Sequence, residues 1–215
     1  MDNKKDTIIF DMDGVLVDSE PVIEAAAIKG LKEYGVDAEP EDFIPFIGAG
    51  EDRYIGGVAE KHGVTYKVEM KKRVYEIYLE IVSSTLDIFD GTEDLLKKLS
   101  GDNYNLALAS SADAVKIDAN LKVADIAQSI FAAIVSGEDV DEKKPAPDIY
   151  LKTADKMDIE PKRCIVIEDS LHGVESARAA GMDCIGVSTS FTEKKLKEAG
   201  ANYVCAEIAE VYQII

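Results

Sequence analysis

Two carboxylates follow a short apolar run near the start of the chain. Asp11 and Asp13 stand two positions apart directly after residues 8–10, and Gly14 comes next. Carboxylate oxygens are the ligands that Mg²⁺ prefers, and ligand crevices in α/β sheets form at the carboxyl ends of strands. The pattern suits a magnesium-held nucleophile beside an acid/base partner, although a solvated loop end after a strand carries the same residues.

Polar side chains also mark three later segments of the chain. In chain order these are Ser110 and Ser111 after an apolar run, Lys144 before a proline, and Glu168 and Asp169 after another apolar run. Phosphoryl transfer needs a nucleophile, neutralisation of the equatorial oxygens and proton delivery to the leaving group. The four segments together supply a candidate for each requirement.

In combination these segments resemble the motifs of the haloacid dehalogenase (HAD) superfamily. Three runs are similar to its β-phosphoglucomutase-like branch, which includes many sugar-phosphate phosphatases. They are Asp13-Gly14-Val15-Leu16, Lys144-Pro145-Ala146-Pro147-Asp148, and Ile167-Glu168-Asp169-Ser170 followed by Gly173-Val174. The resemblance spans essentially the whole chain and implies an enzyme, a Mg²⁺-dependent hydrolase of phosphoric monoesters.

The resemblance also implies roles for the residues of the first motif. Asp11 would attack phosphorus to form an aspartyl-phosphate, a covalent route open to carboxylates. Asp13 would act as general acid and then general base, and its backbone carbonyl would reach Mg²⁺. Gly14 would permit the tight reversal after the strand and the approach of the phosphate.

The other motifs would complete the site. Asp169 would be a carboxylate ligand of Mg²⁺, and Glu168 either a second ligand or a water-mediated support. Ser110 and Ser111 would donate hydrogen bonds to the phosphoryl group, while Lys144 would place a positive charge beside the nucleophile. We expect the neighbouring Lys143 to be solvated, Asp148 to cap a helix, and His172 to be an exposed first-turn residue.

Six short apolar runs are expected to be strands. They cover residues 7–10, 105–109, 132–135, 164–167, 184–187 and 203–205. Stretches with helical spacing separate the later runs, and alternation of strands with helices indicates a parallel, doubly wound sheet. Near-continuous apolar runs are typical of strands that are covered on both faces. The expected fold is therefore an α/β, Rossmann-like core.

Residues 19–87 show helical rather than strand spacing. Ser19 can cap a helix that tolerates Pro21 in its first turn, and residues 52–62 and 68–82 carry similar spacing. An all-helical insert after the first strand resembles the small cap domain of the family. We expect residues 1–18 and 88–215 to form the core domain and residues 19–87 the cap.

Composition limits the classes of partner. The 215 residues include 42 acids and 24 bases, for a net charge of −18, which gives no reason to expect nucleic-acid binding. A phosphate site must then be a local positive pocket made by Mg²⁺, a lysine and backbone N–H groups. The odd number of cysteines, Cys164, Cys184 and Cys205, favours buried thiols over a disulfide framework.

The sequence shows neither a membrane-spanning apolar stretch nor the apolar region of a signal peptide in residues 1–6. We therefore expect a cytoplasmic protein that binds a small phosphorylated metabolite and does not bind membranes. The oligomeric state is open, and a monomer is the expectation.

Two positions favour a phosphatase over a mutase. Family mutases hold a second phosphate with a cap arginine, where this chain has Glu51, and Asp113 adds another acid near the second motif. Ile23 stands where the mutase has a cap histidine, whereas Arg53 could compensate if the alignment shifts. We expect hydrolysis of a small phosphomonoester, a sugar phosphate or related metabolite, with Glu51 and neighbouring cap residues facing a neutral, hydroxylated or cationic leaving group. A phosphosugar mutase and a catalytically weak phosphometabolite-binding regulator remain as alternatives.

Overall fold

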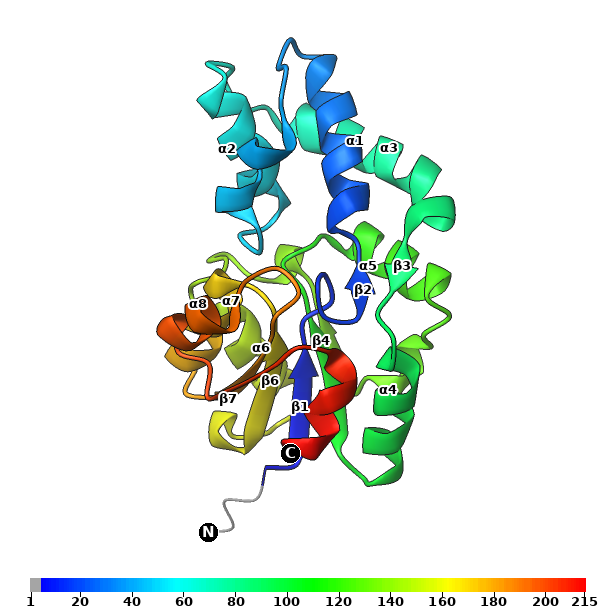
Figure 1. Cartoon of the computed structure of the whole chain (residues 1–215), viewed down its shortest axis with the longest axis vertical. Helices are drawn as coiled ribbons and strands as arrows, with labels where there is room; N and C mark the ends of the chain where they lie inside the picture. Colours follow the sequence, from blue (N-terminus) through cyan, green and yellow to red (C-terminus); the bar gives the residue numbers. More distant parts are fainter. Residues whose placement is uncertain (1–4) are drawn as a thin grey trace.

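A six-stranded parallel sheet forms the centre of the molecule (Figure 1). In the computed structural model, which describes residues 5–215, the strand order is β5-β4-β1-β6-β7-β8. The strands are β1 (Thr7–Phe10), β4 (Asn105–Ala109), β5 (Ala133–Val135), β6 (Cys164–Glu168), β7 (Asp183–Val187) and β8 (Tyr203–Cys205). β1 lies between β4 and β6 and pairs with both, and a crevice forms at this point, where the strand order reverses.

The predicted doubly wound parallel sheet is confirmed. The first and last residues of each predicted strand differ by at most one position from those of the observed strand. The first four residues of the predicted core, and most of the segment predicted to lack a signal peptide, lie outside the described residues. Within residues 5–215 no helix is both long and apolar enough to cross a membrane.

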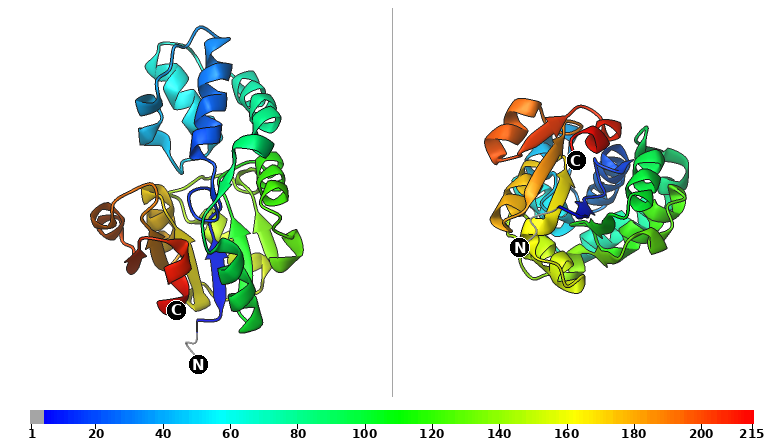
Figure 2. Two further views of the ribbon diagram at one scale, coloured as in Figure 1. Left: turned by 45° about the vertical axis from the view of Figure 1, so that its right-hand side comes forward. Right: turned by 90° about the horizontal axis from the view of Figure 1, so that it is seen from below.

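Helices cover both faces of the sheet (Figure 2). One apolar cluster joins the sheet to α4 (Thr92–Gly101), α5 (Ala114–Val123) and the 3₁₀ segment Ile208–Gln213. The other joins it to α6 (Asp148–Lys156), α7 (Leu171–Ala179) and α8 (Glu193–Ala199). In β1, Ile8 and Phe10 belong to the first cluster and Ile9 to the second, so the strand needs apolar residues at successive positions.

A layer of helices lies over the carboxyl ends of the strands (Figure 1). It contains α1 (Glu20–Lys32), α2 (Glu51–Lys61) and α3 (Val68–Thr85), which share a separate hydrophobic cluster. The chain enters this layer through β2 (Val17–Asp18) and leaves it through β3 (Asp87–Ile88), and these two strands pair antiparallel. The boundaries of the core and cap domains stay a prediction, which the separate cluster supports.

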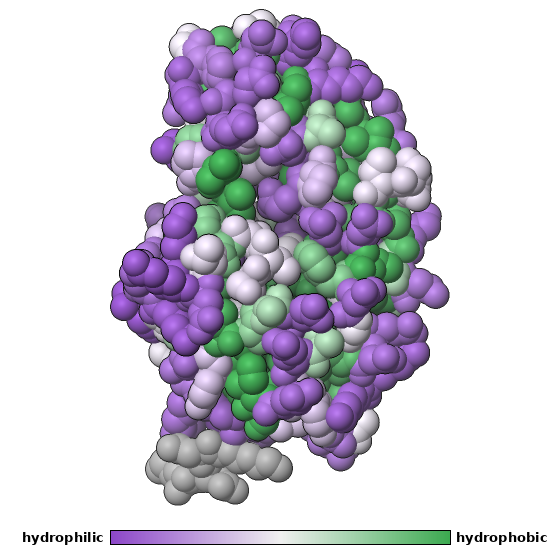
Figure 3. Space-filling view, in the orientation of Figure 1, coloured by the Kyte–Doolittle hydropathy of each residue, from purple (hydrophilic) through white to green (hydrophobic). Residues whose placement is uncertain are grey.

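The three cysteines lie on neighbouring strands β6, β7 and β8, and all three are buried free thiols. Burial raises the pKa of Cys164 and of Cys205 to about 11, and it raises that of Cys184 well above its usual range. Hydrophilic side chains predominate on the outer face seen in Figure 3, with small apolar patches between them.

Candidate active site

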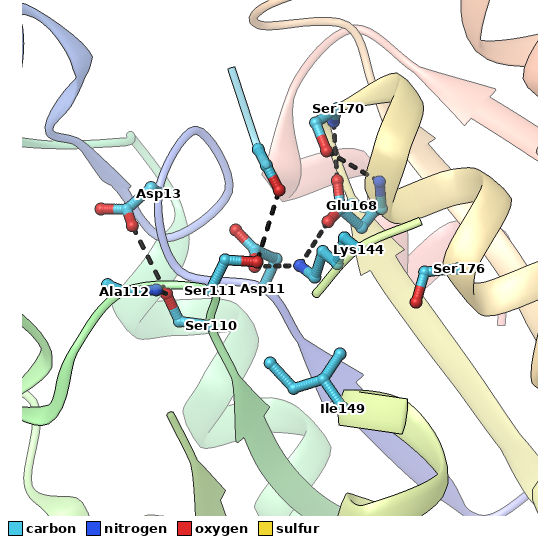
Figure 4. Close-up of polar contacts among 12 residues, drawn as sticks. Asp11, Asp13, Ser110, Ser111, Ala112, Lys144, Ile149, Glu168, Ser170 and Ser176 are labelled. Atoms are coloured by element: carbon cyan, nitrogen blue, oxygen red, sulfur yellow. Dashed lines mark hydrogen bonds and ion pairs between the residues drawn. The ribbon is translucent and has the colours of Figure 1, made fainter. Parts of the chain in front are cut away.

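Asp11 lies at the carboxyl end of β1, in the crevice where the strand order reverses. Its backbone N–H donates to the carbonyl of Ile167 at 2.9 Å, which continues the pairing of β1 with β6 past the last strand residue. The Nζ atom of Lys144 lies 2.6 Å from Asp11 Oδ1, and both side chains are buried (Figure 4). Although burial disfavours a charged lysine, Asp11 and Glu168 hold the pKa of Lys144 well above its usual range. The structure thus brings a fixed positive charge to the predicted nucleophile.

Glu168 holds Lys144 from the opposite side. Its Oε1 lies 2.7 Å from Lys144 Nζ and accepts a hydrogen bond from the Tyr150 hydroxyl at 3.1 Å. Its Oε2 accepts from the backbone N–H of Ser170 at 2.6 Å. A Cβ added at Gly173 would lie 1.6 Å from Glu168 Oε1, so this packing requires glycine there. These contacts position Lys144, and the predicted role of Glu168 as a second metal ligand or a water-mediated support stays a prediction.

Asp169 lies against the loop that follows β1. Its Oδ2 accepts a hydrogen bond from the Ser190 hydroxyl. Gly14, which has a φ of +78°, approaches so closely that an added Cβ would lie 2.0 Å from that same oxygen. Glycine is therefore needed both for the left-handed backbone and for the space it leaves to Asp169.

The buried carboxylates Asp11, Glu168 and Asp169 lie close together at this end of the sheet. Burial, together with the charges of Glu168 and Asp13, raises the pKa of Asp11 to about 7 against the opposing effect of Lys144. Burial and the neighbouring carboxylates Glu168 and Asp11 raise the pKa of Asp169 well above its usual range. A cation between Asp11 and Asp169 would reverse both shifts, because it favours the ionised forms.

The donor set fits Mg²⁺, which binds through one or two carboxylates and keeps several waters. No group of three or more acidic, histidine or cysteine side chains in residues 5–215 is arranged to hold a metal by itself. Asp11 and Asp169 would thus be completed by water, substrate oxygens and the backbone carbonyl predicted at Asp13. This ligand set remains a prediction.

The carboxylate of Asp13 is anchored through one of its two oxygens. Oδ1 accepts hydrogen bonds from the Ser19 hydroxyl and, at 3.3 Å, from Asn120 Nδ2, and it lies 3.0 Å from Lys116 Nζ. Oδ2 is bonded more lightly, by the Ser110 hydroxyl at 3.4 Å. The side chain therefore has one fixed oxygen and one that faces the crevice.

The two serines after β4 lie on the rim of the same crevice (Figure 4). The buried Ser110 accepts a hydrogen bond from the backbone N–H of Ala112 at 3.2 Å, which fixes its hydroxyl near Asp13. Ser111 donates instead to the carbonyl of Gly48 at 3.3 Å and so contacts the helical insert. Both positions are compatible with the predicted contacts to a phosphoryl group, which stay predictions.

Glu51 reaches into the crevice from the start of α2. Its Oε1 lies 3.2 Å from Nζ of Lys116, a buried lysine of α5. Asp113 is also paired, because Lys71 Nζ lies 2.9 Å from its Oδ2. The two acids thus have their own counter-charges. Arg53 is exposed and lies 3.6 Å from Glu60, so it does not supply the missing mutase arginine.

A cavity of about 40 Å³ lies between the sheet and the helical insert. Its lining includes the predicted residues Asp11, Asp13, Ser110, Ser111, Lys144 and Asp169 from the core. The insert contributes Glu20, Ile23, Glu51 and Tyr54 among others. Four chain segments predicted to converge do so.

Several site residues were not identified from the sequence. Lys116 and Asn120 lie one helical turn apart in α5, and both are fully buried. Tyr78 in α3 donates to Asn120 Oδ1 at 2.5 Å. The signal available was a lysine and an amide at positions i and i+4, within a helix whose Ile117 and Leu121 face the core.

Four minor predictions differ from the structure. Ser19 is the N-cap residue of α1 as predicted, but its hydroxyl makes no capping bond, because it donates to Asp13. Asp148 is the first residue of α6 and makes no capping bond, since Pro147 occupies the cap position. Lys143 is not simply solvated, because its Nζ donates to the carbonyls of Gly137 and, at 2.7 Å, Val140. His172 is partly buried, with Nδ1 3.2 Å from the carbonyl of Ile47.

Comparisons with known proteins identify relatives of this chain. The chain is 40% identical over 212 residues to Protein SUPPRESSOR OF QUENCHING 1, chloroplastic, from Arabidopsis thaliana, a match that covers 97% of this chain and 20% of that protein. It therefore spans about a fifth of the length of that relative. It is 34% identical over 208 residues to a phosphorylated carbohydrates phosphatase from Thermotoga maritima, covering 91% of this chain and 92% of the relative.

A solved structure has the same fold over the same length. The crystal structure of β-phosphoglucomutase from Clostridium difficile matches with a TM-score of 0.85 and 25% identity, covering 96% of this chain and 92% of that one. Residues 8–187 match the model of the haloacid dehalogenase-like hydrolase family. The chain therefore belongs to that family of hydrolases.

Proposed function

We propose that this protein is a Mg²⁺-dependent phosphatase that hydrolyses a small phosphomonoester, a sugar phosphate or related metabolite. The observation that carries the proposal is the contact of 2.6 Å between Lys144 Nζ and Asp11 Oδ1, in a cavity that Asp13 and Asp169 also line. The phosphatase name of the Thermotoga maritima relative, which acts on phosphorylated carbohydrates, supports the substrate class.

Asp11 is the nucleophile in this proposal. A carboxylate oxygen of Asp11 attacks phosphorus in line with the leaving oxygen and forms an aspartyl-phosphate. The Lys144 ammonium and the Ser110 hydroxyl lie where they can offset charge on the equatorial oxygens. Bound Mg²⁺ would add charge neutralisation and keep Asp11 ionised.

Asp13 moves the protons. Because its Oδ1 is held by three donors, Oδ2 is the oxygen that would carry the exchanging proton. It protonates the leaving oxygen in the first step and accepts a proton from the attacking water in the second. The same oxygen thus serves both half-reactions.

The helical insert acts as a cap in this proposal. Since a cavity of about 40 Å³ has room for about three waters, the insert must move away from the sheet to admit a phosphomonoester. When the insert returns, it would keep water away from the aspartyl-phosphate until the alcohol product has left the cavity. Chemistry would then occur with the insert returned over the bound substrate, in a cavity larger than the one described above.

A mutase is less well supported. Turning a bisphosphorylated intermediate around requires a second phosphate site, and in this chain Glu51 occupies the corresponding wall of the cavity. Arg53, two positions after Glu51, is paired with Glu60 at the surface. A catalytically weak regulator would be expected to lack one or more catalytic side chains. Every predicted catalytic side chain is present in the site, so the regulator alternative gains no support from it.

Release of inorganic phosphate from a panel of sugar and polyol monophosphates tests the proposal. We expect activity that a chelator abolishes and Mg²⁺ restores, and a loss of at least about a thousandfold in Asp11→Asn. Asp37→Asn, a change at an exposed position of the insert, is the matched control and should leave the rate unchanged. Equal rates in Asp11→Asn and the wild type would reject Asp11 as the nucleophile. Binding of a metabolite and Mg²⁺ without any turnover would support a regulator instead.

A further inference from the structure

One buried oxygen in the cavity has no hydrogen-bond partner. Among the described residues, Glu51 Oε2 is the buried side-chain nitrogen or oxygen atom left unsatisfied. The Glu51 side chain is only 7% exposed and lines the cavity beside Asp13. An unsatisfied buried oxygen costs free energy, and one inside a cavity is therefore a candidate acceptor for a ligand.

The other oxygen of Glu51 belongs to a bridge toward the reacting groups. Nζ of Lys116 lies 3.2 Å from Glu51 Oε1 and 3.0 Å from Asp13 Oδ1. An ammonium carries three N–H groups, so two directed at these carboxylates leave one for a further acceptor. The bridge thus offers a free acceptor and a free donor close to the residue that protonates the leaving oxygen.

We propose that the Glu51–Lys116 pair recognises a hydroxyl group of the substrate on a carbon adjacent to the phosphate ester. The inference rests on the proposed phosphatase function and names the class of its leaving group, a polyol or sugar. A hydroxyl donates one hydrogen bond and accepts others, and it can therefore satisfy Glu51 Oε2 and Lys116 together. Because Lys116 contacts Asp13 as well, the recognised hydroxyl lies near the ester oxygen.

Charged leaving groups fit the pair less well. A second phosphate would lie against Glu51 and Glu20, two carboxylates of the cavity wall, and like charges at such distances repel. A substrate ammonium would compete with Lys116, which already neutralises Glu51 at 3.2 Å. A neutral hydroxyl meets neither obstacle.

The pair also joins the two layers of the molecule. Glu51 belongs to α2 of the insert and Lys116 to α5 of the core, so movement of the insert separates them. Since a cavity of about 40 Å³ is too small for a phosphomonoester, the contact would open and then reform around the substrate in every turnover. Recognition by Glu51 is therefore expressed in the closed complex, and it should appear in kcat/KM.

Two phosphates that differ only in hydroxyls provide the test. We expect the wild-type protein with Mg²⁺ to hydrolyse glycerol 1-phosphate with a kcat/KM at least about tenfold above that of n-propyl phosphate. In Glu51→Gln the ratio should fall by at least about fivefold, because Lys116 would hold the amide oxygen and leave the amide nitrogen, which cannot accept, facing the substrate hydroxyl. Glu60→Gln, the same change at an exposed position of α2, should keep the wild-type ratio. Thermal unfolding of each variant verifies that it is folded.

The outcomes separate this inference from the function on which it rests. Equal wild-type efficiency on both phosphates, with Asp11→Asn inactive on both, would overturn the hydroxyl site and leave the phosphatase intact. A higher kcat/KM for ethanolamine phosphate than for glycerol 1-phosphate would overturn the hydroxyl site, because it would show that Glu51 recognises a positively charged group of the substrate instead. Absence of hydrolysis of every phosphomonoester would overturn the phosphatase and, with it, the leaving-group site.

Discussion

The hydroxyl of Tyr78 donates a hydrogen bond of 2.5 Å to Asn120 Oδ1. Tyr78 lies in α3 of the helical insert, and Asn120 lies in α5 against the sheet. The amide nitrogen of Asn120 then donates to Asp13 Oδ1 at 3.3 Å. The tyrosine thus fixes which end of the amide faces Asp13, and one side chain of the insert orients a predicted catalytic carboxylate.

Replacing this tyrosine by phenylalanine should cost both stability and activity. Tyr78→Phe leaves the buried Asn120 Oδ1 without its donor, which should lower the free energy of unfolding by about 1–3 kcal/mol. The kcat should also fall, because Asp13 loses an ordered donor. Urea unfolding and steady-state kinetics measure the two effects. Tyr203→Phe, at an exposed tyrosine of β8, is the control and should change the free energy of unfolding by less than about 0.5 kcal/mol.

Removal of the Lys144 ammonium should strongly reduce both the stability and the activity of the protein. Lys144→Met keeps the side-chain length but leaves Asp11 and Glu168 facing each other without a cation, and breaking a buried pair costs about 3–5 kcal/mol. We also expect kcat to fall by at least about a hundredfold. Calorimetric unfolding and phosphate release measure these changes, with the partly exposed Lys162→Met as the control. A Lys144→Met protein with wild-type kcat would remove this lysine from the reaction.

Glycine at position 173 protects the geometry of Glu168. Gly173→Ala puts a methyl group 1.6 Å from the present position of Glu168 Oε1, so the carboxylate must move and Lys144 with it. The free energy of unfolding should fall by about 1–3 kcal/mol, and kcat/KM by about tenfold or more. Gly101→Ala is a control of opposite sign. It lies at the end of α4 with open space around it, and the substitution should leave activity unchanged and stabilise the protein by up to about 1 kcal/mol.

Glu20 should make the stability of the protein depend on pH. Burial, together with the charges of Asp13, Glu51 and Glu24, raises the pKa of Glu20 from 4.5 to about 7 against the opposing effect of Lys116. Between these two values the folded protein binds more protons at Glu20 than the unfolded chain does. Its contribution to stability is therefore complete below pH 4.5 and is lost as the pH rises through 7.

Glu20→Gln removes this dependence. Relative to the wild type, its free energy of unfolding should increase by about 1 kcal/mol between pH 5 and pH 8, a value reduced from the full shift because the side chain is partly exposed. Chemical denaturation at the two pH values measures the difference. Glu80→Gln, at an exposed position of α3, should show no such increase. An identical pH profile for Glu20→Gln and the wild type would contradict the assignment.

The sheet and the central part of the site could be predicted from the sequence because their signals are local. Each strand is a short apolar run, and β1 buries successive side chains in different clusters, so the pattern is continuous and easily recognised. Asp11, Asp13 and Asp169 follow such runs directly. Since the carboxyl ends of parallel strands meet at one edge, their convergence follows from the fold.

The residues that complete the site could not be found in this way. Lys116 and Asn120 are polar residues of a helix, and their burial depends on what the insert places above them. Glu51 looked like an acid that repels phosphate, because no sequence rule pairs it with a lysine 65 positions later. The contacts of Glu168 with Lys144 and Tyr150 could not be predicted, because the three residues come from separate segments of the chain.

The three buried thiols can report the order in which the strands of the sheet separate on unfolding. Cys164, Cys184 and Cys205 occupy successive strands from the middle of the sheet to its edge, and their raised pKa values leave little thiolate at neutral pH. An alkylating reagent can modify each one only after its strand separates from the neighbours. The order in which mass spectrometry finds them labelled would record whether the sheet unravels from β8 inward or opens all at once.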